Sequence, residues 1–87
     1  TILLTDEGFV PRSIRITRGT NIVFSNETSN QFWPASNPHP THTLYGAFDS
    51  KRPLASGETW SFVFDTPGVW RYHDHMRSYF TGVIYVE

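Results

Sequence analysis

The chain has 87 residues, a formal charge of −1 and no cysteine. A chain of this length buries only about 60–65% of the surface that its unfolded form exposes, so we expect one domain, 1–87, with a core rich in large side chains. Aromatic residues make up 16% of the sequence and supply them. The lack of cysteine excludes disulfides, thiolate metal sites and cysteine nucleophiles. No basic stripe favours nucleic acid, and no apolar run is long enough to span a membrane.

Short β-rich runs between turn signals predict an all-β chain. In the run 13–20, Ile14 and Ile16 point one way while Arg15 and Thr17 point the other. The expected strands lie in 1–5 (TILLT), 13–20 (SIRITRGT), 21–26 (NIVFSN), 59–68 (TWSFVFDTPG), 68–73 (GVWRYH) and 81–87 (TGVIYVE). Six short strands of this kind predict a small Greek-key β-sandwich or barrel.

A long irregular stretch separates the third and fourth runs, from Asn26 to about Ser56. It contains four prolines, which exclude a continuous central strand there, although 42–46 (HTLYG) is long enough for a short one. A loop of this length is more often functional than idle. Within it, 32–36 (FWPAS) is expected to pack beside a site or to dock a partner, and Asp49 is expected to be a solvated charge.

All four histidines fall into two tight pairs. His73 and His75 follow the fifth run in RYHDHM, and His39 and His42 lie in NPHPTHTLY. If the strand continues, alternation puts His73 and His75 on one face with Cβ atoms about 6.5–7 Å apart, which lets both rings reach one metal ion. Asp74 between them then faces the other way, or orients a ring nitrogen from a bend. The plain alternative is that the histidines are unrelated surface residues.

The donor set limits the choice of metal. Imidazoles without thiolate or a carboxylate cage favour Cu(II), Zn(II) or Ni(II) over Ca²⁺ and Mg²⁺. The affinity order puts Cu(II) first, so we expect copper, with zinc as the rival.

Three motifs in order resemble the cupredoxin family of plastocyanin- and azurin-like proteins. They are GFVPRSIRITRGTNIVFSN, LASGETWSFVFDTPGVWRYH and GVIYVE, which together run from Gly8 to Glu87. The resemblance implies a small Greek-key β-sandwich with one copper ion near one end. In that family the ligands are a His from an upstream loop and then Cys, His and usually Met from the last loop.

Residue by residue, the resemblance implies an atypical site. Asn26 matches an Asn that braces the upstream ligand loop, His42 matches the first His, and His73 matches the Cys. His75 is the best match for the second His, although it lies one residue closer to His73 than usual. Phe80 stands where the axial Met belongs.

These departures imply a copper site made of imidazoles, His42, His73 and His75, with His39 or Met76 as the fourth ligand. We expect His39 rather than Met76, because replacing both the family's Cys and its Met by histidine would give a site made only of imidazoles. The spectrum expected of such a site is that of type 2 copper, because no thiolate is present.

Electron transfer with a redox partner protein is the function that the resemblance implies first. The alternatives are copper carriage or storage with a copper donor or acceptor, a zinc site, and a copper-dependent oxidoreductase, for which no general acid, base or substrate pocket is marked. The chain starts at Thr1 rather than at a methionine, so we expect a piece of a longer exported precursor that works outside the cytoplasm, in the periplasm or at the cell surface.

Overall fold

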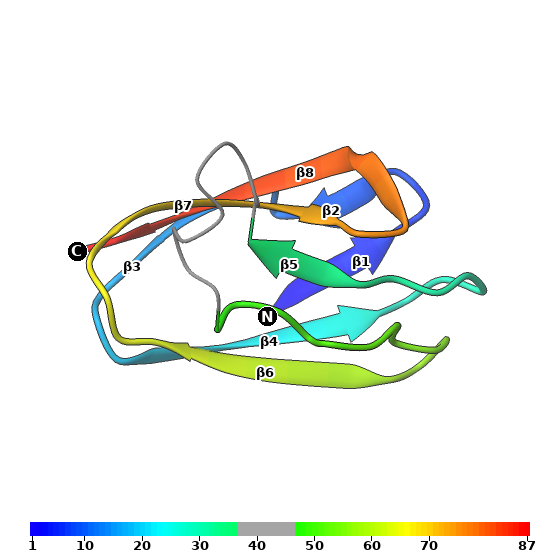
Figure 1. Cartoon of the computed structure of the whole chain (residues 1–87), viewed down its shortest axis with the longest axis horizontal. Coiled ribbons are helices and arrows are strands. Elements are labelled where there is room, and N and C mark those ends of the chain that lie inside the picture. The colour runs from blue at the N-terminus through cyan, green and yellow to red at the C-terminus, as the bar shows by residue number, and fades with distance from the viewer. Residues whose placement is uncertain (37–46) are drawn as a thin grey trace.

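A computed structural model describes residues 1–36 and 47–87, and in these ranges the chain forms eight β-strands and no helix (Figure 1). The described residues accordingly contain no helix that is long and apolar enough to span a membrane. The strands are β1 (Ile2–Thr5), β2 (Gly8–Val10), β3 (Ser13–Ile16), β4 (Thr20–Asn26), β5 (Pro34–Ser36), β6 (Thr59–Phe64), β7 (Gly68–Asp74) and β8 (Arg77–Val86).

The strands form two four-stranded sheets, in the orders β2-β1-β4-β6 and β3-β8-β7-β5. The pairs β1–β4 and β3–β8 are parallel, and the other pairs are antiparallel. The predicted all-β sandwich is therefore confirmed.

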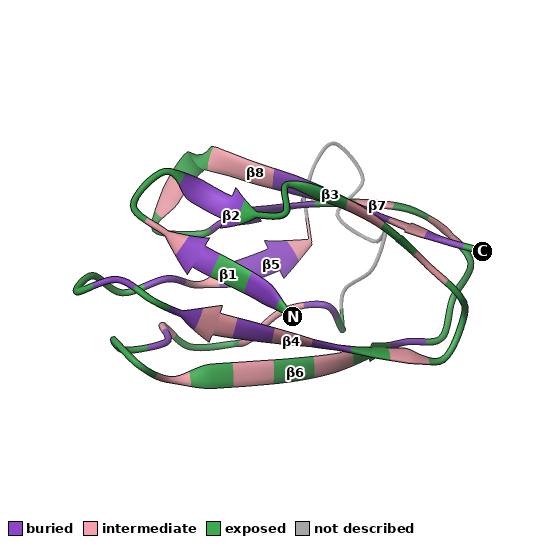
Figure 2. Cartoon of the chain, turned by 180° about the vertical axis from the view of Figure 1, so that it is seen from behind, coloured by how far each residue is buried: buried purple, intermediate pink, exposed green. Residues whose placement is uncertain are grey.

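The core lies between the sheets, and burial alternates with the side chains along strands such as β1 and β4 (Figure 2). In β7 and β8, Tyr72 and Ile84 point inward and have no exposed surface. The ring of Tyr72 lies 5.7 Å from that of Phe24 on the opposite sheet and 5.1 Å from that of Phe48. The other members of the buried cluster are Ile2, Leu4, Phe9, Ile22, Phe32, Leu54, Phe64 and Val86.

One glycine is required by this core. A Cβ atom on Gly82 would lie 2.5 Å from Cζ of Tyr72, a distance that real Cβ atoms do not adopt. The lack of a side chain at Gly82 of β8 thus leaves room for the tip of the Tyr72 ring, which comes from the adjacent central strand of the sheet that carries the candidate site.

The structure differs from the expected strands in three places. β2 and β5 are additional to the expected set, and β8 begins at Arg77 rather than at Thr81. β5 tolerates Pro34 because it is the outermost strand of its sheet and Pro34 is its first residue, which agrees with the expectation that no central strand forms there. The possible strand at 42–46 lies outside the described residues.

Candidate metal centre

The strand β7 divides its last residues between two faces of the sheet. Tyr72 and Asp74 are fully buried on the inner side. Because side chains alternate along a strand, His73 lies on the outer face of the sheet β3-β8-β7-β5. Its cross-strand partners are Ala35 of β5 and Thr81 of β8. Even on this outer face, His73 is only 9% exposed.

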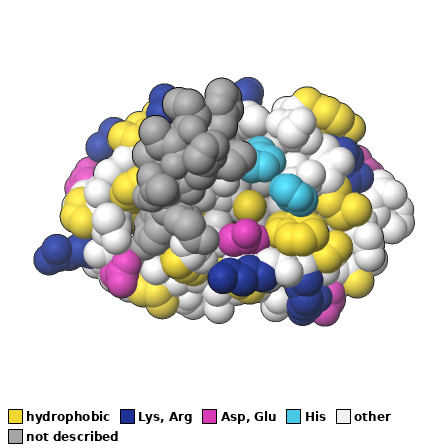
Figure 3. Space-filling model, viewed as in Figure 1, with side chains coloured by type: hydrophobic (Ala, Val, Ile, Leu, Met, Phe, Trp, Pro, Cys, Tyr) yellow, Lys and Arg dark blue, Asp and Glu magenta, His cyan; other side chains and the backbone are white. Residues whose placement is uncertain are grey.

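His75 reaches the same place although the strand does not continue to it. β7 ends at Asp74, with a register irregularity between His73 and Asp74. The backbone N–H of His75 then donates to the carbonyl of Trp33 at 2.7 Å. The ring centroids of His73 and His75 lie 6.1 Å apart, and the two rings are neighbours on one face of the molecule (Figure 3).

This separation suits a shared ion after a small adjustment. With metal–nitrogen distances of about 2.0–2.1 Å, two imidazoles at adjacent positions on one ion have centroids roughly 4.5–5 Å apart. The observed ring centroids, at 6.1 Å, are about 1–1.5 Å farther apart than that. His75 is exposed, so its side chain is free to rotate on the solvent side.

The surroundings of His73 favour its neutral form. Burial lowers the pKa of His73 below its ordinary value, and the nearby His75 lowers it further, while Asp74 and Asp49 act in the opposite direction. A neutral imidazole is the form that binds a metal, so fewer protons compete for this ring at neutral pH than for an exposed histidine.

Trp33 and Asp49 frame the histidine pair, and sequence reasoning gave neither a role of its own. The Trp33 ring lies 4.7 Å from the His75 ring, and its indole N–H donates to Oδ1 of Asp49 at 2.7 Å. The same oxygen accepts the N–H of Lys51 at 2.7 Å. Asp49 also forms a β-bridge with Ala35, the partner of His73. The run 32–36 therefore packs beside the histidines, while Asp49 is a fixed carboxylate rather than a freely solvated charge.

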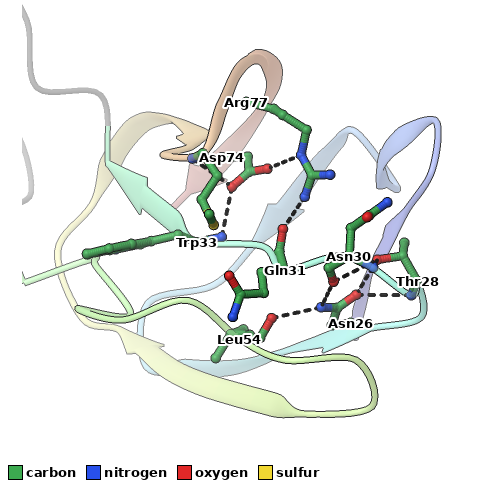
Figure 4. Close-up of polar contacts among 9 residues, drawn as sticks. Asn26, Thr28, Asn30, Gln31, Trp33, Leu54, Asp74 and Arg77 are labelled. Atoms are coloured by element: carbon green, nitrogen blue, oxygen red, sulfur yellow. Dashed lines mark hydrogen bonds and ion pairs between the residues drawn. The ribbon is translucent and has the colours of Figure 1, made fainter.

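Asp74 faces away from the histidines and into the protein, which was one of the two outcomes expected for it. Its Oδ1 accepts the backbone N–H groups of Trp33 at 2.8 Å and Met76 at 3.1 Å, and its Oδ2 pairs with Nε of Arg77 at 3.0 Å (Figure 4). Arg77 also donates to the carbonyl of Gln31. We call Asp74, Arg77 and these backbone partners the turn latch, because they tie the β7–β8 turn to the segment before β5.

Solved structures share this architecture. A purple cupredoxin from Nitrosopumilus maritimus aligns with a TM-score of 0.85 at 21% identity, covering 99% of this chain and 97% of that one. This protein has a cupredoxin-like fold. A mutant of amicyanin, in its reduced Cu(I) form at pH 4, aligns with a TM-score of 0.85 at 14% identity over 99% of this chain and 79% of that one. A copper-containing nitrite reductase from Thermus scotoductus aligns with a TM-score of 0.82 at 21% identity. The alignment covers 99% of this chain and 21% of that one.

Sequence comparison adds no further relative: no protein-family model and no curated protein matches the chain. At 14–21% identity the likeness to the solved structures establishes the fold alone.

The residues that the resemblance pairs with the family's Cys and Met lie on opposite faces of the sheet. His73 is on the outer face, whereas Phe80 shares the inner face of β8 with the buried Gly82 and Ile84 and stacks on Phe32 with centroids 5.9 Å apart. A site that combines both positions, as in the family, does not form here. Met76, the alternative fourth ligand, follows His75 and is 48% exposed.

Asn26, the last residue of β4, braces the loop segments at Thr28, Asn30 and Leu54, as the resemblance implies. Its side-chain nitrogen donates to the carbonyls of Asn30 at 2.8 Å and Leu54 at 2.9 Å. Its side-chain oxygen accepts the N–H of Thr28 at 3.0 Å and the hydroxyl of Thr28 at 2.8 Å (Figure 4). Both N–H donors and the oxygen of the Asn26 side chain are thus used to fix the chain before and after β5.

Two of the four predicted ligands, His73 and His75, are brought together by the fold. The other two, His39 and His42, lie outside the described residues. Within 1–36 and 47–87, no three His, Asp or Glu side chains are grouped as a complete metal site. Any ion at this place therefore needs further ligands besides the two described imidazoles.

Proposed function

We propose that this chain is a mononuclear copper protein in which imidazoles of His39, His42, His73 and His75 hold the ion, and that it transfers electrons. The observation that carries the proposal is the pairing of the His73 and His75 rings at 6.1 Å on the outer face of a cupredoxin-like sandwich. Two imidazoles supply half of a four-coordinate site, and they are positioned by backbone contacts that do not depend on a metal.

Chain connectivity supports the participation of the other two histidines. The segment 37–46 starts after Ser36 and ends before Ala47, and the N–H of Ser36 donates to the carbonyl of Phe48 at 2.7 Å. Both ends of the segment are therefore fixed close to Ala35, the cross-strand partner of His73. His39 is three residues from one fixed end and His42 is five from the other, so the extended chain reaches at most about 11 Å and 18 Å.

The donor set supports copper over other metals. The imidazoles present are borderline ligands that suit Cu(II) best in the affinity order, and a chain with no cysteine cannot supply a thiolate. Copper, when bound, supplies one-electron chemistry between Cu(II) and Cu(I). The contribution of this chain is to hold His75 against the Trp33 ring, which bonds in turn to Asp49, close to His73 before the ion arrives, and this limits rearrangement between the two oxidation states.

Copper carriage outside the cytoplasm is the second candidate, and the exposure of His75 favours it. An exposed ligand is accessible to a competing chelator or to a copper acceptor protein. Protonation of the imidazoles also gives a means of release, since metal binding requires their neutral forms.

The first experiment is a copper titration of the apo protein, followed by metal analysis, visible absorption and EPR. We expect one Cu(II) per chain, a type 2 EPR signal and only weak visible bands. The pair His73→Gln and His75→Gln should lower the affinity by more than about a hundredfold, because loss of a group that merely orients a ligand already costs about 10–100-fold. His39→Gln and His42→Gln test the other two ligands singly.

The matched control is Gln31→Ala, which changes a nearby exposed side chain and should leave the affinity unchanged. Unchanged copper affinity in the double variant would contradict the proposal, as would tighter binding of zinc than of copper by the wild-type chain. Electron transfer further predicts rapid reduction by a small donor with the copper retained, whereas carriage predicts rapid loss of copper to a chelator.

A further inference from the structure

A groove of about 500 Å³ opens on the outer face of the same sheet, next to the histidines. Arg71 lies two residues before His73 on β7, and Thr81 is the cross-strand partner of His73. Both residues line the groove, so it starts directly beside His73. The lining residues are Arg12, Ser13, Arg71, Thr81, Gly82, Val83 and Tyr85.

Arg12 and Arg71 flank β8, the strand beneath the middle of this groove, from opposite sides. The N–H of Val83 donates to the carbonyl of Arg12 at 2.9 Å, and Arg71 is the cross-strand partner of Val83 on the other side. Because neighbouring strands are about 4.8 Å apart, the backbones that carry the two arginines are separated by roughly 10 Å across β8. Both side chains line the same space above that strand.

The groove has positive charge without a compensating carboxylate. None of its lining residues is Asp or Glu. Among the described residues, the guanidinium of Arg12 makes only a long hydrogen bond of 3.4 Å to the hydroxyl of Thr81, and no carboxylate forms an ion pair with Arg12 or Arg71. Arg15 on the same face shows the contrast, since it pairs with Glu87 at 3.1 Å.

We infer that this groove binds a small oxyanion of the carboxylate or phosphate class between Arg12 and Arg71. The planar guanidinium groups present paired N–H donors that match the oxygen atoms of such an anion. The hydroxyls of Ser13, Thr81 and Tyr85 add neutral donors around the same space. The groove is concave and only partly apolar, which suits a small polar ligand. The binding site belongs to the protein alone and does not depend on the proposed copper.

The test is an NMR titration of the metal-free full chain with inorganic phosphate, and separately with acetate, at constant ionic strength. We expect saturable amide shifts at Val83, Thr81 and Arg71 with millimolar affinity, and the tighter of the two probes identifies the preferred class. Arg12→Gln and Arg71→Gln should each weaken binding by about tenfold or more, the effect of losing a hydrogen bond between charged groups.

Arg18→Gln is the matched control, because it removes the same charge from the turn between β3 and β4, outside the groove. Shifts that remain linear with concentration would overturn the inference. So would saturable binding that Arg12→Gln and Arg71→Gln leave unchanged, or that Arg18→Gln weakens equally. Since no metal is present in these titrations, failure of the copper proposal leaves their outcome unaffected.

Discussion

Replacing Asp74 by Ala and by Asn should destabilise the protein to clearly different extents. Asp74 has no exposed surface, and its two oxygens have separate partners. Oδ1 accepts two backbone N–H groups, from Trp33 and Met76, while Oδ2 pairs with Arg77, whose side chain is 22% exposed. Alanine removes both oxygens and with them all three hydrogen bonds, and it leaves a mostly buried guanidinium without its counter-charge. The loss of one partner from a buried ion pair typically costs about 3–5 kcal/mol.

Asparagine keeps an oxygen where Oδ1 stands and can retain both backbone bonds. It removes the negative charge beside Arg77, as alanine does, but it spares the two backbone bonds, which are worth about 0.5–1.5 kcal/mol each. For a chain of this length the total free energy of unfolding is about 4–13 kcal/mol. Asp74→Ala therefore removes a large share of the stability, and Asp74→Asn removes less.

Urea unfolding of the metal-free protein measures both free energies, with the slope against urea concentration expected to stay constant. Asp6→Ala, in the turn between β1 and β2, is the control and should change stability by no more than about 0.5 kcal/mol. Equal losses for Asp74→Ala and Asp74→Asn, or losses below about 1 kcal/mol for both, would refute the assignment of the two oxygens. The β7–β8 turn would then be held by other contacts than the turn latch.

Three further outcomes follow from the geometry. Gly82→Ala should cost about 1–3 kcal/mol or more in urea unfolding, because its Cβ would lie 2.5 Å from Cζ of the fully buried Tyr72; Ser78→Ala on the same strand should be nearly neutral. Burial lowers the pKa of His73 below 6.5, so the unfolded chain binds more protons there, and the metal-free protein should lose stability as the pH falls below 6.5; His73→Gln should reduce that pH dependence in unfolding curves between about pH 5 and 7.5. Phe80→Met should leave the EPR spectrum of the copper-loaded protein unchanged, since Phe80 lies on the inner face of the sheet; a new thioether ligand in the spectrum would contradict this.

Most of the fold could be predicted from local patterns. In the run 13–20, the apolar Ile14 and Ile16 alternate with the polar Arg15 and Thr17, which is long enough to show a period of two. Each of the expected β-rich runs contains a strand in the structure. β2 and β5 could not be predicted because three residues cannot display a period. The first part of β8 could not be predicted because Arg77 and Ser78 interrupt the β-rich composition, and the pairing with β7 across a tight turn decides its conformation instead.

Only part of the candidate site could be predicted in the same way. The closeness of His73 and His75 is predicted from their spacing of two, but β7 ends at Asp74, and the backbone bond of His75 to Trp33 fixes His75 beside His73. The positions of Trp33 and Asp49 depend on Ala35. Ala35 pairs with His73 of β7 on one side and forms a β-bridge with Asp49 on the other. These pairings join residues that are far apart in the sequence, and no residue pattern in a single chain indicates them.

The face on which His73 lies is decided by Tyr72. Tyr72 is fixed in the core by its contacts with Phe24 and Phe48, so the next residue must point outward and the one after it inward. The inward place is taken by Asp74, which is fully buried and paired with Arg77. The interior at this end of the sandwich thus carries an ion pair rather than a space for a metal. An ion bound by His73 would therefore lie on the outer side of the sheet, where the exposed His75 is accessible to solvent and to a partner.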